Sequence, residues 1–307
     1  MTDTIIKALW TALGATAVQL LVLLGTLLAL VAILTLTSNL VCRLAVEVVG
    51  RRPYLWLFGW LGAAVHEVSH AALCVLFGHR ITEMRVFEPD PATGRLGYVR
   101  HAFSPRNPYH LIGNFFIATG PVVAGSAVIA LAAWLLLGPG GDTAPRSVPF
   151  GTVENGALSE AGRLLGHLGA GVSRLGEMIG NVGQRTWYVN AAFLWIAFSV
   201  GGLMALSPAD LKGAIHGLVA IAVMVYLANV IALVAAGAPL TRYAWDASRH
   251  MGFGYSMMAL AAVLNAAMAL ALGLLVLPVR VLKVLFGPAP QVHPADGSRP
   301  PAKPGEG

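Results

Sequence analysis

The chain has 307 residues, of which 57% are hydrophobic and 11% are charged, and its mean hydropathy is +0.72. A soluble domain of this length needs a far more polar surface, so the composition excludes that class and indicates an all-α polytopic membrane protein. The net charge of +6 comes without an aromatic-interleaved basic patch, so we attribute it to membrane topology and expect no nucleic-acid partner. The two cysteines, Cys42 and Cys74, indicate neither a disulfide framework nor a metal site made of cysteine alone.

Six stretches are long and apolar enough to cross a lipid bilayer, which takes about 20 residues per helix. They run over residues 9–36, 54–77, 109–137, 187–206, 212–236 and 255–286. We therefore expect about six transmembrane helices.

The segment between the second and third spans, residues 79–108, predicts two short strands. Its sequences RITEMRVFE and RLGYVRHAF flank PDPATG, a turn-forming stretch. The segment also holds five arginines, and basic residues are enriched in short loops on the cytoplasmic side of a membrane. We therefore expect a cytoplasmic β-hairpin, with both chain termini cytoplasmic, in a multi-pass protein of the bacterial inner (plasma) membrane.

The segment between the third and fourth spans, residues 138–186, begins rich in proline and glycine. Its second half places leucine, valine and isoleucine at helical spacing, with Glu160 and Arg163 among the charged residues between them. This pattern predicts an amphipathic helix lying on the outer membrane face. Residues 287–307, after the last span, are rich in proline and glycine and are expected to be disordered.

The second predicted span contains His66-Glu67-Val68-Ser69-His70, an HExxH motif. Positions i and i+4 share one face of a helix, so both imidazoles can bind one Zn²⁺. Glu67 is offset by about 100°, close enough to act as a general base toward a water at the metal. Ionisable groups within spans are costly and usually functional. The competing interpretation is a polar cluster that only holds helices together.

A catalytic zinc ion takes three protein ligands and one water. The outstanding acid near the ends of the other spans is Asp210, which follows the fourth span. The second and fourth spans cross the membrane in the same direction, so Asp210 is expected on the same side as the two histidines. The run Ser207-Pro208-Ala209-Asp210 is also typical of a helix start. Both roles therefore stay open for Asp210: zinc ligand, or helix cap alone.

Three further residues are candidates for orienting the ligands or the substrate: Ser69, His216 and Asn190. His216 follows Asp210 closely but is equally well explained as a core histidine. Asn190 lies in the fourth span, where an asparagine usually hydrogen-bonds between helices. Cys74 shares the helical face of His70 and is interpreted as a small apolar filler. One Zn²⁺ per chain is the only cofactor expected.

Together these motifs resemble the site-2 protease family of intramembrane zinc metalloproteases, as a short, divergent member without a PDZ domain. HEVSH resembles the first core helix of the family, FGHRITEMRVFE…GRLGYVRHAF its hairpin, IATGPVVAG its second core helix, and SPADLKG the motif with the third zinc ligand. The resemblance implies that His66, His70 and Asp210 bind zinc and that Glu67 is the catalytic base. It also implies hydrolysis of a peptide bond in or near a transmembrane segment of a membrane-protein substrate within the lipid bilayer.

The resemblance covers about residues 54–216, a protease-like membrane core. Around it lie an N-terminal transmembrane helix with its connector (1–53), the C-terminal transmembrane helices (217–286) and the tail (287–307). One alternative is another membrane-embedded HExxH peptidase, acting at the cytoplasmic face with Glu154, Glu160 or Glu177 as third ligand, although all three lie in the predicted outer loop. The other alternative is a non-catalytic membrane scaffold or transporter-like protein.

Overall fold

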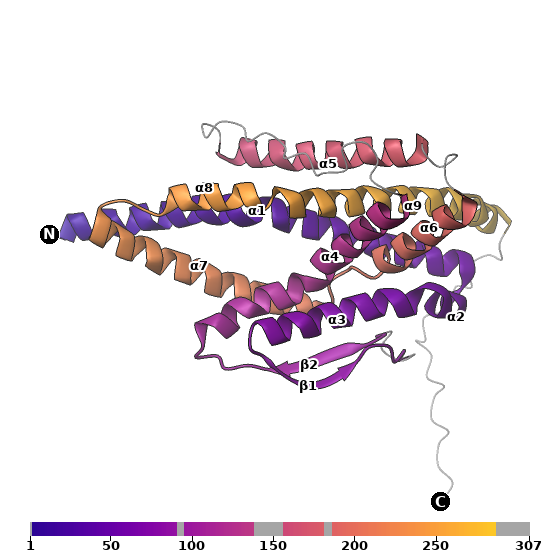
Figure 1. The fold of residues 1–307 in the computed structure, drawn as a ribbon, viewed down its shortest axis with the longest axis horizontal. Helices are drawn as coiled ribbons and strands as arrows, with labels where there is room; N and C mark the ends of the chain where they lie inside the picture. The colour runs from indigo at the N-terminus through magenta and orange to yellow at the C-terminus, as the bar shows by residue number, and fades with distance from the viewer. Residues whose placement is uncertain (1, 91–94, 138–155, 181–185, 287–307) are drawn as a thin grey trace, which may run out of the picture.

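The structure is a computed structural model of the chain (Figure 1), which describes residues 2–90, 95–137, 156–180 and 186–286. The expected tail, residues 287–307, and the Pro/Gly-rich start of the 138–186 segment lie outside the described residues. The described residues form helices and one two-stranded sheet, in the following order: α1 (Thr2–Val49), α2 (Arg51–Tyr54), a π-helical turn (Leu55–Gly59), α3 (Trp60–Leu76), β1 (Arg80–Arg85), β2 (Tyr98–Ala102), α4 (Pro108–Leu137), α5 (Gly156–Gly180), α6 (Trp187–Gly201), α7 (Pro208–Ala236), α8 (Thr241–His250) and α9 (Gly252–Phe286).

Four of the described helices, α1, α4, α7 and α9, are long and apolar enough to cross a membrane. The least buried of them is α7, which turns a continuous apolar stripe outward, as a lipid-facing helix does. Each side chain of this stripe is more than half exposed: Leu211, Ile215, Val219, Val223, Leu227, Ile231 and Val234. The chain is thus an all-α protein compatible with a membrane, but length and composition do not show all six expected spans.

The two remaining expected spans are shorter as regular α-helices. The stretch 187–206 is helical only as α6, which has 15 residues and ends at Gly201. The stretch 54–77 contains α3, which has 17 residues and follows α2 and the π-helical turn directly. At the N-terminal side, the connector expected after residue 36 is helical, because α1 continues to Val49. The residue after the helix is Gly50, whose φ of 85° lies in the left-handed region that favours glycine.

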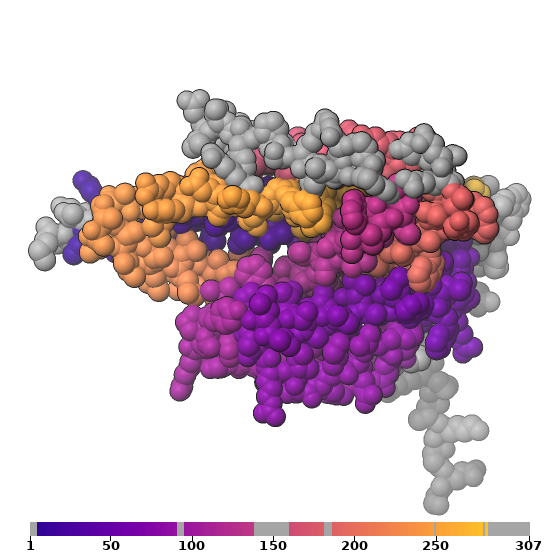
Figure 2. Space-filling model, viewed as in Figure 1, coloured from indigo at the N-terminus to yellow at the C-terminus, as the bar shows by residue number. Residues whose placement is uncertain are grey.

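The helices are arranged in layers (Figure 1). On one side, α5 lies along α9 and α1, while α3 lies on the opposite side with the hairpin packed against it. Between these two sides, α4, α6 and α7 run obliquely. The main core forms where α1, α4, α6 and α9 meet. In the space-filling view, α3, the hairpin and the start of α4 form the lower half of the molecule (Figure 2).

The predicted hairpin is confirmed as an antiparallel pair of strands. β1 pairs with β2 from Arg80 opposite Ala102 to Arg85 opposite Tyr98, with one register shift after Ile81. Arg100 donates a hydrogen bond of 2.9 Å to Glu83 across the pair. The hairpin follows the end of α3, the helix that carries the HExxH motif.

The amphipathic helix expected within 138–186 is present as α5, but the polar side chains of its first half face the protein. Glu160 pairs with Arg163 and accepts a 3.0 Å hydrogen bond from Thr26 of α1, and all three side chains are buried. His167 lies 3.1 Å from the Ser256 hydroxyl of α9. The exposed side of α5 carries large apolar side chains instead, with Leu165, Val172 and Ile179 each more than half exposed. Helical spacing reveals two faces but not which one the neighbouring helices cover.

Candidate metal centre

The two histidines of the HExxH motif are held on one face of α3 by backbone carbonyls. His66 Nδ1 donates to the Leu203 carbonyl at 2.9 Å, and His70 Nδ1 donates to the Ile117 carbonyl at 2.8 Å. A carbonyl only accepts hydrogen bonds, so each Nδ1 carries a proton, and in the neutral imidazole each Nε2 then has the lone pair. This is the usual arrangement of histidines that bind a metal through Nε2.

Both carbonyls are available because each lies where a helix is interrupted. Ile117 stands four residues before Pro121 within α4, and proline has no N–H to bond the carbonyl at i−4. Leu203 lies just beyond the end of α6 at Gly201. Gly62 lets α3 approach this end of α6, since a Cβ at Gly62 would lie 2.2 Å from the Ser199 carbonyl oxygen.

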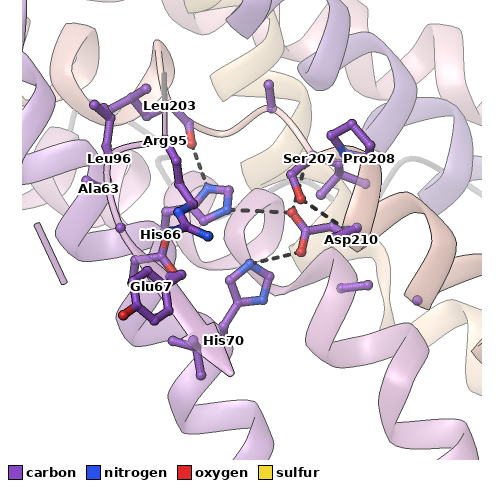
Figure 3. Close-up of a pocket in the computed structure, with 18 of the residues that line it drawn as sticks. Ala63, His66, Glu67, His70, Arg95, Leu96, Leu203, Ser207, Pro208 and Asp210 are labelled. Atoms are coloured by element: carbon purple, nitrogen blue, oxygen red, sulfur yellow. Dashed lines mark hydrogen bonds and ion pairs between the residues drawn. The ribbon is translucent and has the colours of Figure 1, made fainter. Parts of the chain in front are cut away.

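Asp210 faces both imidazoles from the first turn of α7 (Figure 3). Its Oδ1 lies 3.3 Å from His70 Nε2, and its Oδ2 lies 3.8 Å from His66 Nε2. The predicted helix start is also present as a capping box. The Ser207 N–H donates to Asp210 Oδ2 at 2.8 Å, and the Asp210 N–H donates to Ser207 Oγ at 3.2 Å. The cap thus fixes the carboxylate in the position where it faces His66 and His70.

The three side chains fit a zinc ion by donor type and by spacing. Zinc–ligand bonds of about 2.0–2.1 Å at tetrahedral angles separate neighbouring donor atoms by about 3.3–3.4 Å. The distances of 3.3 and 3.8 Å from the Asp210 oxygens to the imidazole nitrogens lie at and slightly above that value. Two imidazoles and a carboxylate form a ligand set that leaves a fourth position open.

A cavity of about 770 Å³ opens onto these three residues and is also lined by Glu67. Glu67 is buried, at 8% exposure, in a place where an unpaired carboxylate is costly and usually functional. The segment that leads into β2 covers it, since a Cβ at Gly97 would lie 2.8 Å from Glu67 Cγ. The cavity is lined by α1, α3, α4, the hairpin and the start of α7. Glu67 and the three candidate ligands therefore face the same cavity.

The three candidates for orienting groups lie outside this arrangement. Ser69 Oγ donates to the His66 carbonyl within its own helix at 2.7 Å, and faces Gly120 of α4. His216 is exposed, and its Nδ1 bonds the Lys212 carbonyl. Asn190 lies in the first turn of α6, and neither it nor His216 lines the cavity.

The glutamates considered as alternative third ligands are not near the histidines in the described part of the chain. Glu160 is engaged with Arg163 and Thr26 on the α5 side of the molecule, away from α3. Glu177 is exposed on α5, and Glu154 lies outside the described residues. Asp210 is the acid that the fold brings to the HExxH motif.

The groups that sequence reasoning missed are mostly backbone atoms. The carbonyls of Ile117 and Leu203 and the close contact at Gly97 carry no side-chain signal of their own. One of them had an indirect signal: Pro121 in an apolar helix implies an unbonded carbonyl at position 117. The buried Asn114 of α4 also lines the cavity.

Pro121→Ala is expected to weaken zinc binding by about tenfold, at the lower end of the 10–100-fold range for losing a ligand's hydrogen-bond partner. The new N–H at position 121 competes with His70 Nδ1 for the Ile117 carbonyl. The same change removes a proline from a helix interior, so the midpoint of thermal unfolding should stay equal or rise. Zinc competition titration and thermal melts measure the two effects.

Ser126→Ala is the matched control in the same helix. Its hydroxyl bonds only the Val122 carbonyl in the described structure, so zinc affinity should not change. A Pro121→Ala protein with wild-type zinc affinity would contradict the role assigned to the Ile117 carbonyl.

Comparison of the chain with protein-family models, with curated proteins and with solved structures found no match.

Proposed function

We propose that this protein is an intramembrane zinc metalloprotease that hydrolyses a peptide bond in or near a transmembrane segment of a membrane-protein substrate. The observation that carries the proposal is the convergence of His66 Nε2, His70 Nε2 and the Asp210 carboxylate, with both Nδ1 atoms bonded to backbone carbonyls. In the neutral imidazoles both Nε2 lone pairs then face one carboxylate, an arrangement that a metal ion would bridge and that helix packing alone does not require.

The division of roles follows from the chemistry of the groups. His66, His70 and Asp210 would hold the zinc ion. When bound, zinc polarises a carbonyl and lowers the pKa of a water to about 7. Glu67, in the same cavity, accepts a proton from the attacking water and delivers it to the leaving amine. The low exposure of Glu67 limits its contact with bulk water to the side that faces the cavity.

The membrane topology proposed with this function has six crossings. To the four long apolar helices it adds α6 and the continuous helical stretch from α2 to α3. Both chain termini and the arginine-containing hairpin are then cytoplasmic, in a bacterial inner membrane. The metal centre would lie close to the cytoplasmic side, where water reaches it through the cavity.

The proposal is tested by metal content and by cleavage together. Purified wild-type protein should contain zinc and should cleave peptides with transmembrane segments in detergent or liposomes. A chelator should abolish cleavage, and added zinc should restore it. His66→Ala should not regain cleavage with zinc. Cleavage that persists in the chelated protein, or in His66→Ala, would disprove a zinc peptidase centred on this motif.

A further inference from the structure

A second group of metal-ligating side chains lies at the base of the hairpin. Among the described residues, Cys74, His79 and His101 bring their ligand atoms within 4.8 Å of one another. They share no residue with the His66–His70–Asp210 group, although His101 also borders its cavity. Cys74 and His79 are buried, and His101 is half-buried. We refer to these three residues as the hairpin cluster.

The end of α3 brings Cys74 and His79 together. Gly78 has a φ of 69°, a left-handed conformation that turns the chain back on the helix. In this turn the His79 N–H donates to the Cys74 carbonyl at 2.8 Å, and the Gly78 N–H donates to the Val75 carbonyl at 3.1 Å. This pair of bonds is a Schellman motif, which holds His79 against the last turn of the helix.

The hairpin adds the third side chain. His101 lies in β2 opposite Ile81 of β1, and its Nδ1 lies 3.0 Å from His79 Nδ1. The cluster thus joins three parts of the fold: the helix that carries the HExxH motif, the turn after it, and the strand that lines the cavity.

The hydrogen bonds of His79 place its unprotonated nitrogen inside the cluster. His79 Nε2 lies 2.9 Å from the His110 carbonyl, which only accepts, so Nε2 carries the proton and the Nδ1 lone pair faces His101. This is the tautomer of a metal-binding histidine whose other nitrogen is bonded to a carbonyl. His110 itself is otherwise occupied, since its Nδ1 accepts from the Ser104 N–H at 3.0 Å.

We propose that the hairpin cluster is a second zinc site, in which Cys74, His79 and His101 bind one Zn²⁺ and tie the hairpin to α3. One thiolate and two imidazoles are donors that suit zinc. Tetrahedral zinc separates nitrogen and sulfur donors by about 3.3–3.6 Å. The His79–His101 pair, now at 3.0 Å, would open slightly to bind the ion, and the ligand atoms of all three residues, which lie within 4.8 Å of one another, would adjust to this spacing. Binding there would fix the position of the strand that leads from Gly97 to His101. The proposal does not depend on the peptidase function.

The two sites are distinguishable because only the hairpin cluster contains a thiolate. Full-length protein loaded with Co²⁺ should show a sulfur-to-cobalt charge-transfer band in the near ultraviolet. The band should disappear in Cys74→Ala and persist in Cys42→Ala and in His66→Ala. In parallel, zinc content should fall from two equivalents per chain to one in Cys74→Ala, with the remaining equivalent reporting an intact first site.

His101→Ala provides a second variant that leaves the buried helix face unchanged, and it should also lose one zinc equivalent. The proposal is overturned if cobalt-loaded wild-type protein lacks the band, if the band depends on Cys42, or if His101→Ala keeps two equivalents. Any of these results would mean that His79 and His101 only hydrogen-bond to each other. The cobalt band of His66→Ala tests the hairpin cluster separately, because it does not require metal in the His66–His70–Asp210 site.

Discussion

Asp210→Asn is expected to remove most of the zinc from the His66–His70–Asp210 site and to abolish peptide cleavage. The substitution keeps the volume of the side chain. It also keeps an oxygen that can accept from the Ser207 N–H, which lies 2.8 Å from Oδ2 of Asp210 in the unchanged protein. It removes the negative charge that faces the two imidazoles at 3.3 and 3.8 Å. Since ligand carboxylates contribute charge as well as geometry, zinc bound per chain should fall by one equivalent in metal analysis.

Ser207→Ala is the matched control for the capping role of Asp210. It removes the hydroxyl that accepts from the Asp210 N–H and leaves the carboxylate in place. Losing an N-cap hydroxyl costs about 0.5–2 kcal/mol of stability, so the thermal midpoint should fall while zinc content stays at the wild-type level. The opposite pattern, zinc retained in Asp210→Asn and lost in Ser207→Ala, would mean that Asp210 is a helix cap alone.

Glu67→Gln is expected to lower kcat by about 10²–10⁴-fold, the usual contribution of a general base. The amide has nearly the same shape as the carboxylate, so the contact with the segment around Gly97 should persist. An amide does not accept a proton at neutral pH, so the variant lacks the general base. Glu67 is not one of the three proposed zinc ligands, so the metal should stay bound. Single-turnover cleavage of a transmembrane peptide and metal analysis of the same sample measure both quantities.

The control for Glu67→Gln is its zinc content. Zinc content of Glu67→Gln should equal that of the wild type, and the affinity for an uncleaved substrate peptide should change little. If Glu67→Gln cleaves the peptide at the wild-type rate, Glu67 is not the base. If the variant loses zinc, Glu67 belongs to the ligand set instead. The second result would also reopen the assignment of Asp210.

Several parts of the molecule could be predicted because their signals are local in the sequence. The hairpin follows from a turn-forming stretch between two short β-prone segments, and its two strands are present. The start of α7 follows from Ser207 and Pro208 ahead of an acid, and its capping box is present. The placement of His66 and His70 on one face follows from helical geometry. Each depends on residues only a few positions apart.

Other features needed the packed structure. The helix α8 has ten residues and is mostly polar, so it is too short and too polar to be found in a search for membrane-spanning stretches. The inward polar face of α5 depends on Thr26 and Ser256 from two other helices. The hairpin cluster, with Cys74 read as a filler, depends on a turn and a strand that bring His79 and His101 to one helix end.

By itself, the sequence determined an apolar helical protein with an HExxH motif, a hairpin after it and a capped helix beginning near Asp210. Only the tertiary structure decided that Asp210 faces both histidines and that Ile117 and Leu203 orient them. The physical reason is that these contacts join segments more than forty residues apart, and their distances depend on how closely the helices approach. That approach is set at positions such as Gly62 and Gly217, where a Cβ would lie 2.2 Å from backbone atoms of α6 and α4.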